Sequence, residues 1–131
     1  MQQNQKAAKY AGLAKTAQSF VSARRTGQAL KTYPGAQPQT LEEAYSIQDT
    51  AIDLWTDEIA GWKVGRITGE AEGQLGVDRL AGPIFSAAVS QADGVVATPI
   101  FEDGFAAVEG EVIIILGDDA PAHKTDWTTE E

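Results

Sequence analysis

The sequence contains no cysteine and a single histidine, and none of its apolar runs is long. Without cysteine there is no disulfide bond, iron–sulfur cluster or thiol nucleophile, and one histidine leaves too few ligands for an ordinary zinc site. The longest purely aliphatic run, residues 112–116, is far shorter than the ~20 residues that a membrane-spanning helix needs. We therefore expect a protein without a membrane partner, and the absence of cysteine fits a cytoplasmic location.

Acidic residues are absent from residues 1–40, which carry six positive charges. Residues 41–131 carry four positive and 19 negative charges, so the whole chain of 131 residues has a net charge of −9. Because proteins bind nucleic-acid phosphates through lysine and arginine, this acidic body argues against a nucleic-acid partner. The length suits one folding unit, in which we distinguish a helical segment (1–57) from a β-rich segment (58–131).

Two helices are expected in the helical segment. Thr40 and Glu43 have the spacing of a capping box, in which each side chain binds one free N–H group at a helix end, so the second helix begins at Thr40. It ends near Asp57, and its apolar stripe, which Gln48 interrupts, consists of Leu41, Ala44, Ala51 and Trp55. In the first helix the apolar residues recur at helical spacing; they are Tyr10, Leu13, Ala14, Ala17, Phe20 and Val21.

Strands are expected in three places in the β-rich segment. Residues 61–65 resemble a short strand flanked by glycines, and residues 94–98 end at Pro99. Residues 106–116 are small, β-branched and aliphatic, which is the strongest strand pattern in the chain. The glycine-rich stretch 66–82 is expected to be a loop. The sequence thus predicts an α+β fold with helices first and strands after them.

Glu109 and Glu111 are the first candidates for chemistry. Residues i and i+2 of a strand share one face, so their carboxylates would lie close together, about 7 Å apart at the backbone. Two buried carboxylates repel each other and lose hydration. A hard divalent cation, Mg²⁺ or Mn²⁺, removes both problems because it prefers oxygen ligands. The alternative is a strand that begins only at Val112 and leaves both acids in solvent.

Lys63 and Asp78 are the second pair of candidates. In a central strand Lys63 would point into a cavity, where a lysine needs an anion or loses its proton. In an edge strand it would simply face solvent. Asp78 lies in a glycine-rich loop, where most aspartates only bind turn amides.

Five short segments follow one another along the chain: AYSIQ at 44–48, GWKVG at 61–65, LGVD at 75–78, GPIF at 82–85 and EGEV at 109–112. With these segments in this order and at fitting spacing, the chain resembles the 2-keto-4-pentenoate hydratase group of the fumarylacetoacetate hydrolase superfamily. That group also contains 2-oxohepta-3-ene-1,7-dioate hydratase and 4-oxalocrotonate decarboxylase.

The resemblance implies N-terminal helices followed by a mixed β-roll around a divalent metal. It implies that Glu109 and Glu111 bind Mg²⁺ or Mn²⁺, that Lys63 holds the substrate carboxylate or moves a proton, and that Asp78 is an acid/base or orienting group. The substrate would be a 2-hydroxy-2,4-dienoate of aromatic catabolism. Water would add to it and give a 4-hydroxy-2-oxo acid, with the metal as Lewis acid. Family members commonly form homo-oligomers.

Two other functions stay open at this point. A 4-oxalocrotonate-type decarboxylase would use the same residues and release CO₂. The chain could also be a catalytically inactive fragment or binding subunit, because the family domain is about twice as long and its third acidic ligand would lie beyond Glu131. A capping-box pattern at 128–131 with no helix after it agrees with a longer protein. In that case the hydrophobic face of Val112, Ile114 and Leu116 would lack partners, which predicts low stability or self-association.

Overall fold

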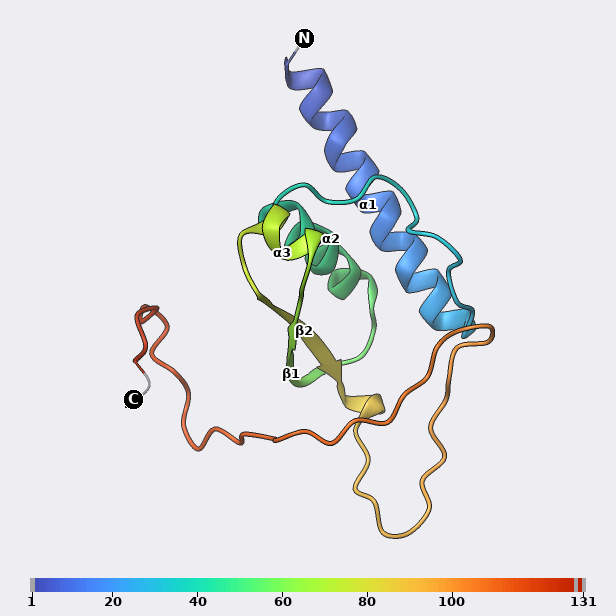
Figure 1. Cartoon of the computed structure of the whole chain (residues 1–131), viewed down its shortest axis with the longest axis vertical. Coiled ribbons are helices and arrows are strands. Elements are labelled where there is room, and N and C mark those ends of the chain that lie inside the picture. The colour runs from blue at the N-terminus through green and yellow to red at the C-terminus, as the bar shows by residue number, and fades with distance from the viewer. Residues whose placement is uncertain (1, 129, 131) are drawn as a thin grey trace.

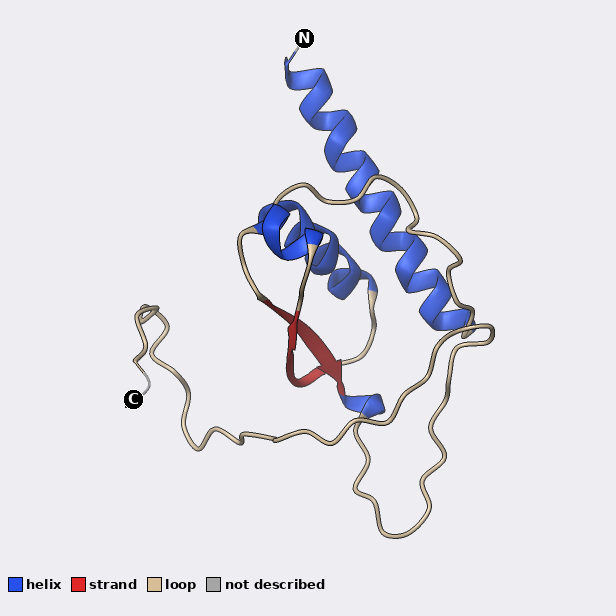
Figure 2. Cartoon of the chain, viewed as in Figure 1, coloured by secondary structure: helices blue, strands red, loops and turns tan. Residues whose placement is uncertain are grey.

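The structure, a computed structural model, describes residues 2–128 and 130. Within these residues it has three α-helices, one antiparallel pair of strands and a short 3₁₀-helix, so the α+β class is confirmed (Figures 1 and 2). The expected capping box at 128–131 includes positions 129 and 131, which lie outside the described residues. The elements are α1 (Gln2–Thr26), α2 (Leu41–Leu54), β1 (Ile59–Arg66), α3 (Glu70–Leu75), β2 (Arg79–Phe85) and η1 (Ser86–Ala88).

The first helix, α1, is the long one that the apolar spacing predicts. Leu13, Ala17 and Val21 from the expected stripe are buried, whereas Tyr10 and Phe20 are 43% and 37% exposed. The stripe is therefore in contact with the rest of the protein along only part of the helix. Neither this helix nor any other in the described part of the chain is long and apolar enough to cross a bilayer.

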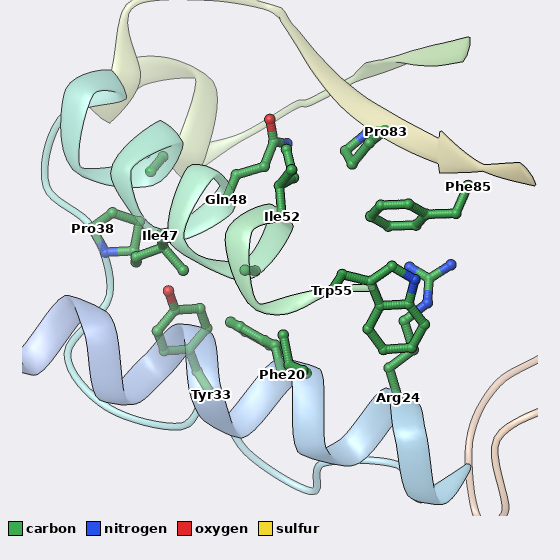
Figure 3. A pocket seen from close by; sticks show the side chains of 13 residues that line it. Phe20, Arg24, Tyr33, Pro38, Ile47, Gln48, Ile52, Trp55, Pro83 and Phe85 are labelled. Carbon is green, nitrogen blue, oxygen red and sulfur yellow. The ribbon is translucent and has the colours of Figure 1, made fainter. Parts of the chain in front are cut away.

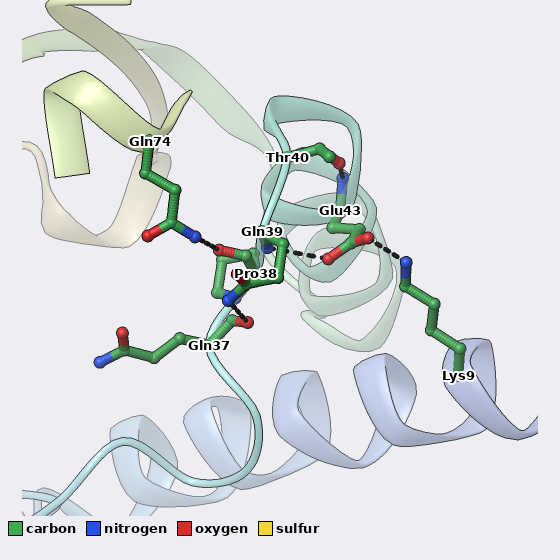
Figure 4. A network of polar contacts seen from close by, with 7 residues as sticks. All are labelled: Lys9, Gln37, Pro38, Gln39, Thr40, Glu43 and Gln74. Atoms are coloured by element: carbon green, nitrogen blue, oxygen red, sulfur yellow. Dashed lines mark hydrogen bonds and ion pairs between the residues drawn. The ribbon is translucent and has the colours of Figure 1, made fainter. Parts of the chain in front are cut away.

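The second helix, α2, begins where its capping residues predict. Thr40 Oγ1 accepts a hydrogen bond from the backbone N–H of Glu43 at 3.2 Å, as in a capping box. The Glu43 carboxylate differs from the expectation, because it accepts the N–H of Gln39, one residue before the cap, at 2.9 Å. The same carboxylate forms an ion pair with Lys9 of α1 (Figure 4). One side chain thus helps to begin α2 and joins it to α1.

The core lies between α1 and α2. Leu13 and Ala17 pack against Ile47, with Ala51 beside them, so Ile47 is buried in α2 although it was not among the residues of the expected stripe. Gln48, which interrupts that stripe, has a structural function: its Nε2 donates to the carbonyl of Ala81 in β2 at 2.8 Å. The side chain therefore satisfies its polar group while it ties α2 to the strand pair.

The strand pair is an antiparallel hairpin in which Lys63 lies opposite Gly82 and Arg66 opposite Arg79. The strand predicted at 61–65 is confirmed as part of β1. The loop predicted for 66–82 is wrong, because this stretch contains α3 and most of β2. Its glycines are used at the ends of α3, where Gly69 and Gly76 have φ angles of +73° and +69°. Glycine adopts this left-handed region without steric cost.

The strands predicted at 94–98 and 106–116 are both wrong. Neither stretch has regular secondary structure, and Figure 1 shows the second running outward from the body of the protein. A strand needs a neighbour for its backbone N–H and C=O groups, and a β-branched sequence does not supply one. The one bridge that the described part of this region makes is between Glu102 and Gln28, where Glu102 N donates to the carbonyl of Gly27 at 2.8 Å.

Candidate functional site

Lys63 lies in β1, and the hairpin leaves its side chain accessible. The strand pair has no third strand, so the central-strand cavity that one reading of the sequence predicts for Lys63 is absent among the described residues. The side chain is 44% exposed. Lys63 is nevertheless not simply in solvent, because it faces two acids from a distant part of the chain.

Glu109 and Glu111 converge on the Lys63 ammonium group. Lys63 Nζ donates to Glu109 Oε2 at 3.5 Å and also contacts Glu111 Oε1, across 46 and 48 residues of sequence. The two acids lie on one side of their segment, as the i, i+2 spacing predicts for an extended backbone, although the segment is not a strand. The structure therefore brings together three of the four residues singled out by sequence.

The site is open to solvent. The Glu109 side chain is 68% exposed and that of Glu111 is 48% exposed. Exposed ion pairs of this kind contribute little to folding stability, because water and salt screen them. The arrangement is therefore better explained as an accessible charge cluster than as a structural anchor.

The two carboxylates determine the charge of Lys63. The hydrogen bond to Glu111, followed by the charges of both acids, raises the pKa of the Lys63 ammonium group above its ordinary value. A lysine with a raised pKa stays protonated at neutral pH. In this arrangement Lys63 is a cation that can bind an anion, and it is poorly suited to accept a proton.

Glu109 and Glu111 carry the oxygen ligands that a hard divalent cation prefers. In this structure both carboxylates pair with the Lys63 ammonium group, so a cation would have to replace Lys63 at the point where they converge. Mg²⁺ is often bound through one or two carboxylates and keeps several waters or substrate oxygens. The described residues contain no group of three Asp, Glu, His or Cys side chains arranged for a metal. A cation here would have two ligands from these residues.

Asp78 lies apart from this cluster. Its carboxylate accepts a hydrogen bond from Arg79 Nη1 at 2.8 Å, and its backbone carbonyl accepts the N–H of Ile67 at 3.0 Å. Ile67 directly follows β1 and is four residues from Lys63, which corresponds to about 13 Å of extended chain. The structure thus pairs Asp78 with a neighbouring arginine and does not bring it to the site that contains Lys63.

The structure also has a cavity that the sequence patterns did not indicate. A cavity of about 330 Å³ lies between α1, α2 and β2, and Arg24 lies at one end of it (Figure 3). The sequence signal for this cavity is a set of aromatic side chains that are far apart in the sequence and that only the tertiary structure brings together. They are Phe20 of α1, Tyr33 of the connection between α1 and α2, Trp55 directly after α2, and Phe85 of β2.

The comparisons with known proteins add no relative. No family model, curated protein or solved structure matches this sequence. Interpretation of the site therefore depends on its own residues and on the resemblance of its short motifs.

Proposed function

We propose that this chain belongs to a divalent-metal-dependent hydratase that adds water to a 2-hydroxy-2,4-dienoate and gives a 4-hydroxy-2-oxo acid. One observation carries the proposal: Lys63, Glu109 and Glu111 face one another although they are far apart in the sequence. These are the residues that the motif resemblance assigns to substrate and metal. The resemblance further implies that the full enzyme has a mixed β-roll of the fumarylacetoacetate hydrolase type, of which β1 and β2 would form part.

Each residue of the cluster has a distinct part in this reaction. Glu109 and Glu111 would hold Mg²⁺ or Mn²⁺, which supplies Lewis acidity to an oxygen of the substrate. Lys63, a cation at neutral pH, would leave the two acids to the metal, bind the 1-carboxylate of the dienoate and orient its chain. Asp78 is proposed by the resemblance as an acid/base or orienting group. The hydrogen bond between Asp78 and Arg79 gives no independent support for a function of Asp78 in the reaction.

The same cluster suits a 4-oxalocrotonate-type decarboxylase, because both reactions need a bound 2-oxo acid whose developing enolate charge is stabilised. The product distinguishes the two reactions, since decarboxylation releases CO₂ and hydration does not. A third outcome is a binding subunit without catalysis, in which the cluster would bind a metal and a 2-oxo acid without turning it over.

The test is an assay of this chain with 2-hydroxypenta-2,4-dienoate and Mg²⁺ or Mn²⁺. We expect loss of the dienol absorbance, formation of 4-hydroxy-2-oxopentanoate and no CO₂. Glu111→Gln should lower the rate by about tenfold or more, because removing a charged hydrogen-bond partner costs ~1.5–3 kcal/mol.

Asp119→Asn is the matched control, since it removes another exposed carboxylate from the same region of the chain. Its rate should stay close to that of the unmodified chain. The proposal would be overturned by equal losses in Glu111→Gln and Asp119→Asn, or by no turnover together with no binding of Mn²⁺.

A further inference from the structure

The cavity between α1, α2 and β2 combines apolar walls with a charged group at one end. Its lining is mostly aromatic and aliphatic. Phe20 and Tyr33 meet edge to face with their ring centroids 5.5 Å apart, and Trp55 and Phe85 lie 5.6 Å apart. Small-molecule sites are typically pockets of about 300–1,000 Å³ with apolar walls and a few polar groups that orient the ligand. At about 330 Å³, this cavity suits a small ligand.

Arg24 is the charged group, and the protein does not neutralise it. Its guanidinium carbon lies 5.2 Å from the ring centroids of both Trp55 and Phe85. No carboxylate pairs with Arg24 in the described part of the chain. The neighbouring Arg25 also lies over Trp55, 5.7 Å from its ring centroid, but its Nη2 donates to the carbonyl of Leu54 at 2.6 Å and it does not line the cavity. Arg24 is therefore held on the aromatic rings with its N–H groups available to an anion.

Tyr33 supplies a second polar group at the other end of the cavity. In Figure 3 its ring lies between α1 and α2, on the far side of Phe20 from Arg24. Its hydroxyl has no hydrogen-bond partner among the residues that the structure describes. Burial raises the pKa of Tyr33, so the hydroxyl stays a donor at neutral pH.

We propose that this cavity binds a small aromatic carboxylate, with the ring between the aromatic walls and the carboxylate on Arg24. A flat ring can stack or meet edge to face with Phe20, Trp55 and Phe85. The planar guanidinium matches a carboxylate in two parallel hydrogen bonds. An uncharged aromatic compound would satisfy the walls and leave Arg24 unpaired, so the carboxylate gives the site its selectivity.

The cavity is separate from the cluster that contains Lys63. Pro83 and Phe85 line the cavity and lie two residues apart in β2, so they share one face of the hairpin. Lys63 is paired with Gly82, the residue before Pro83, and alternation along a strand places neighbouring positions on opposite faces. Lys63, Glu109 and Glu111 are not among the residues that line the cavity. A ligand in the cavity therefore does not depend on the metal and substrate residues of the proposed function.

The test is equilibrium dialysis of 2-naphthoate against the full chain. We expect saturable binding to one site, and binding about tenfold or more weaker in Arg24→Gln, since a hydrogen-bonded charge is lost. Arg25→Gln removes the same charge one position further along α1 and should bind 2-naphthoate within about twofold of the unmodified chain. The neutral analogue 2-naphthylmethanol should bind as weakly to the unmodified chain as 2-naphthoate binds to Arg24→Gln.

Two further variants separate loss of the site from loss of the fold. Ala51→Leu should fill part of the cavity and abolish binding. Because Ala51 also packs beside the core, where a larger side chain can destabilise the protein, its thermal melt is measured alongside and should keep a cooperative transition. Lys63→Met should bind 2-naphthoate normally. The proposal is overturned if the unmodified chain does not bind 2-naphthoate, if 2-naphthylmethanol binds equally well, or if Arg24→Gln and Arg25→Gln bind alike.

Discussion

Glu43 shows how one side chain can carry two interactions at once. Its carboxylate accepts the N–H of Gln39 and pairs with Lys9, which joins the start of α2 to α1 (Figure 4). The hydrogen bond from Gln39, and after it the contact with Lys9, lowers the pKa of the Glu43 carboxyl group below its ordinary value. The charged form is therefore favoured by folding.

This shift predicts a pH-dependent stability. A carboxyl group with a lowered pKa in the folded state contributes stability above its unfolded pKa of about 4.3, and loses it as pH falls through the folded pKa. Glu43→Gln should therefore lower the melting temperature at pH 7. The loss should shrink as the pH is lowered through this range, because the unmodified carboxyl group is then protonated too. Thermal melts of the unmodified chain and of Glu43→Gln over a pH series measure this difference in melting temperature.

Glu42→Gln is the control, because Glu42 lies in the same first turn of α2 and makes the same favourable interaction with the helix dipole. Glu42→Gln should lower the melting temperature at pH 7 by less than Glu43→Gln does. A pH-independent difference between the unmodified chain and Glu43→Gln would contradict this account of the capping interaction.

At the scale of an element, α3 is a six-residue helix bounded by glycines. Gly76 ends it in the left-handed region with a φ of +69°, where a side chain is strained. Gly73 lies inside the helix with open space where a Cβ would project. The two glycines therefore have opposite expected responses to the same substitution.

Gly76→Ala should destabilise the protein by about 1 kcal/mol, because alanine is disfavoured in the left-handed region. Gly73→Ala should stabilise it by about 0.5–1 kcal/mol, since alanine loses less backbone entropy in a helix. Urea denaturation of the two variants measures both changes. Shifts of the same sign would show that α3 does not end at Gly76 as described.

The elements that sequence predicts correctly are those with local signals. Thr40 and Glu43 define the start of α2 through contacts only a few residues apart, and the apolar spacing around Leu13 and Ala17 is a property of α1 itself. The strand expected at 106–116 depends instead on a partner strand, which the sequence pattern does not reveal. The candidate site is predicted in part for the same reason. The sequence itself contains the i, i+2 spacing of Glu109 and Glu111, whereas their contact with Lys63 depends on tertiary structure.

At the scale of the whole molecule, the aliphatic residues 112–116 are not covered by the rest of the protein. Their exposed fractions lie between 76% and 91%, which agrees with the sequence prediction that Val112, Ile114 and Leu116 lack partners. A short, β-branched and uncharged segment with free backbone groups pairs readily with another copy of itself. Self-association of this chain is the expected consequence.

Sedimentation velocity over a range of concentrations measures that association. Ile113→Lys combined with Ile115→Lys should shift the distribution toward the monomer, because charges oppose strand pairing and apolar contact. Val95→Lys with Ile100→Lys adds the same charge at two other exposed apolar positions and should leave the association largely unchanged. A monomeric unmodified chain at all concentrations would contradict the prediction.

The cluster of Lys63, Glu109 and Glu111 is the central claim, and a thermal melt tests it most directly. A ligand that binds only the folded state raises the melting temperature, with a stabilisation of about 2.7 kcal/mol at 100 times its Kd. We predict a cooperative transition that rises when Mn²⁺ and oxalate are added together, with oxalate as a mimic of the substrate enolate. Glu109→Gln should remove most of this rise. No cooperative transition, no rise with the two ligands, or the same rise in Glu109→Gln would contradict the claim.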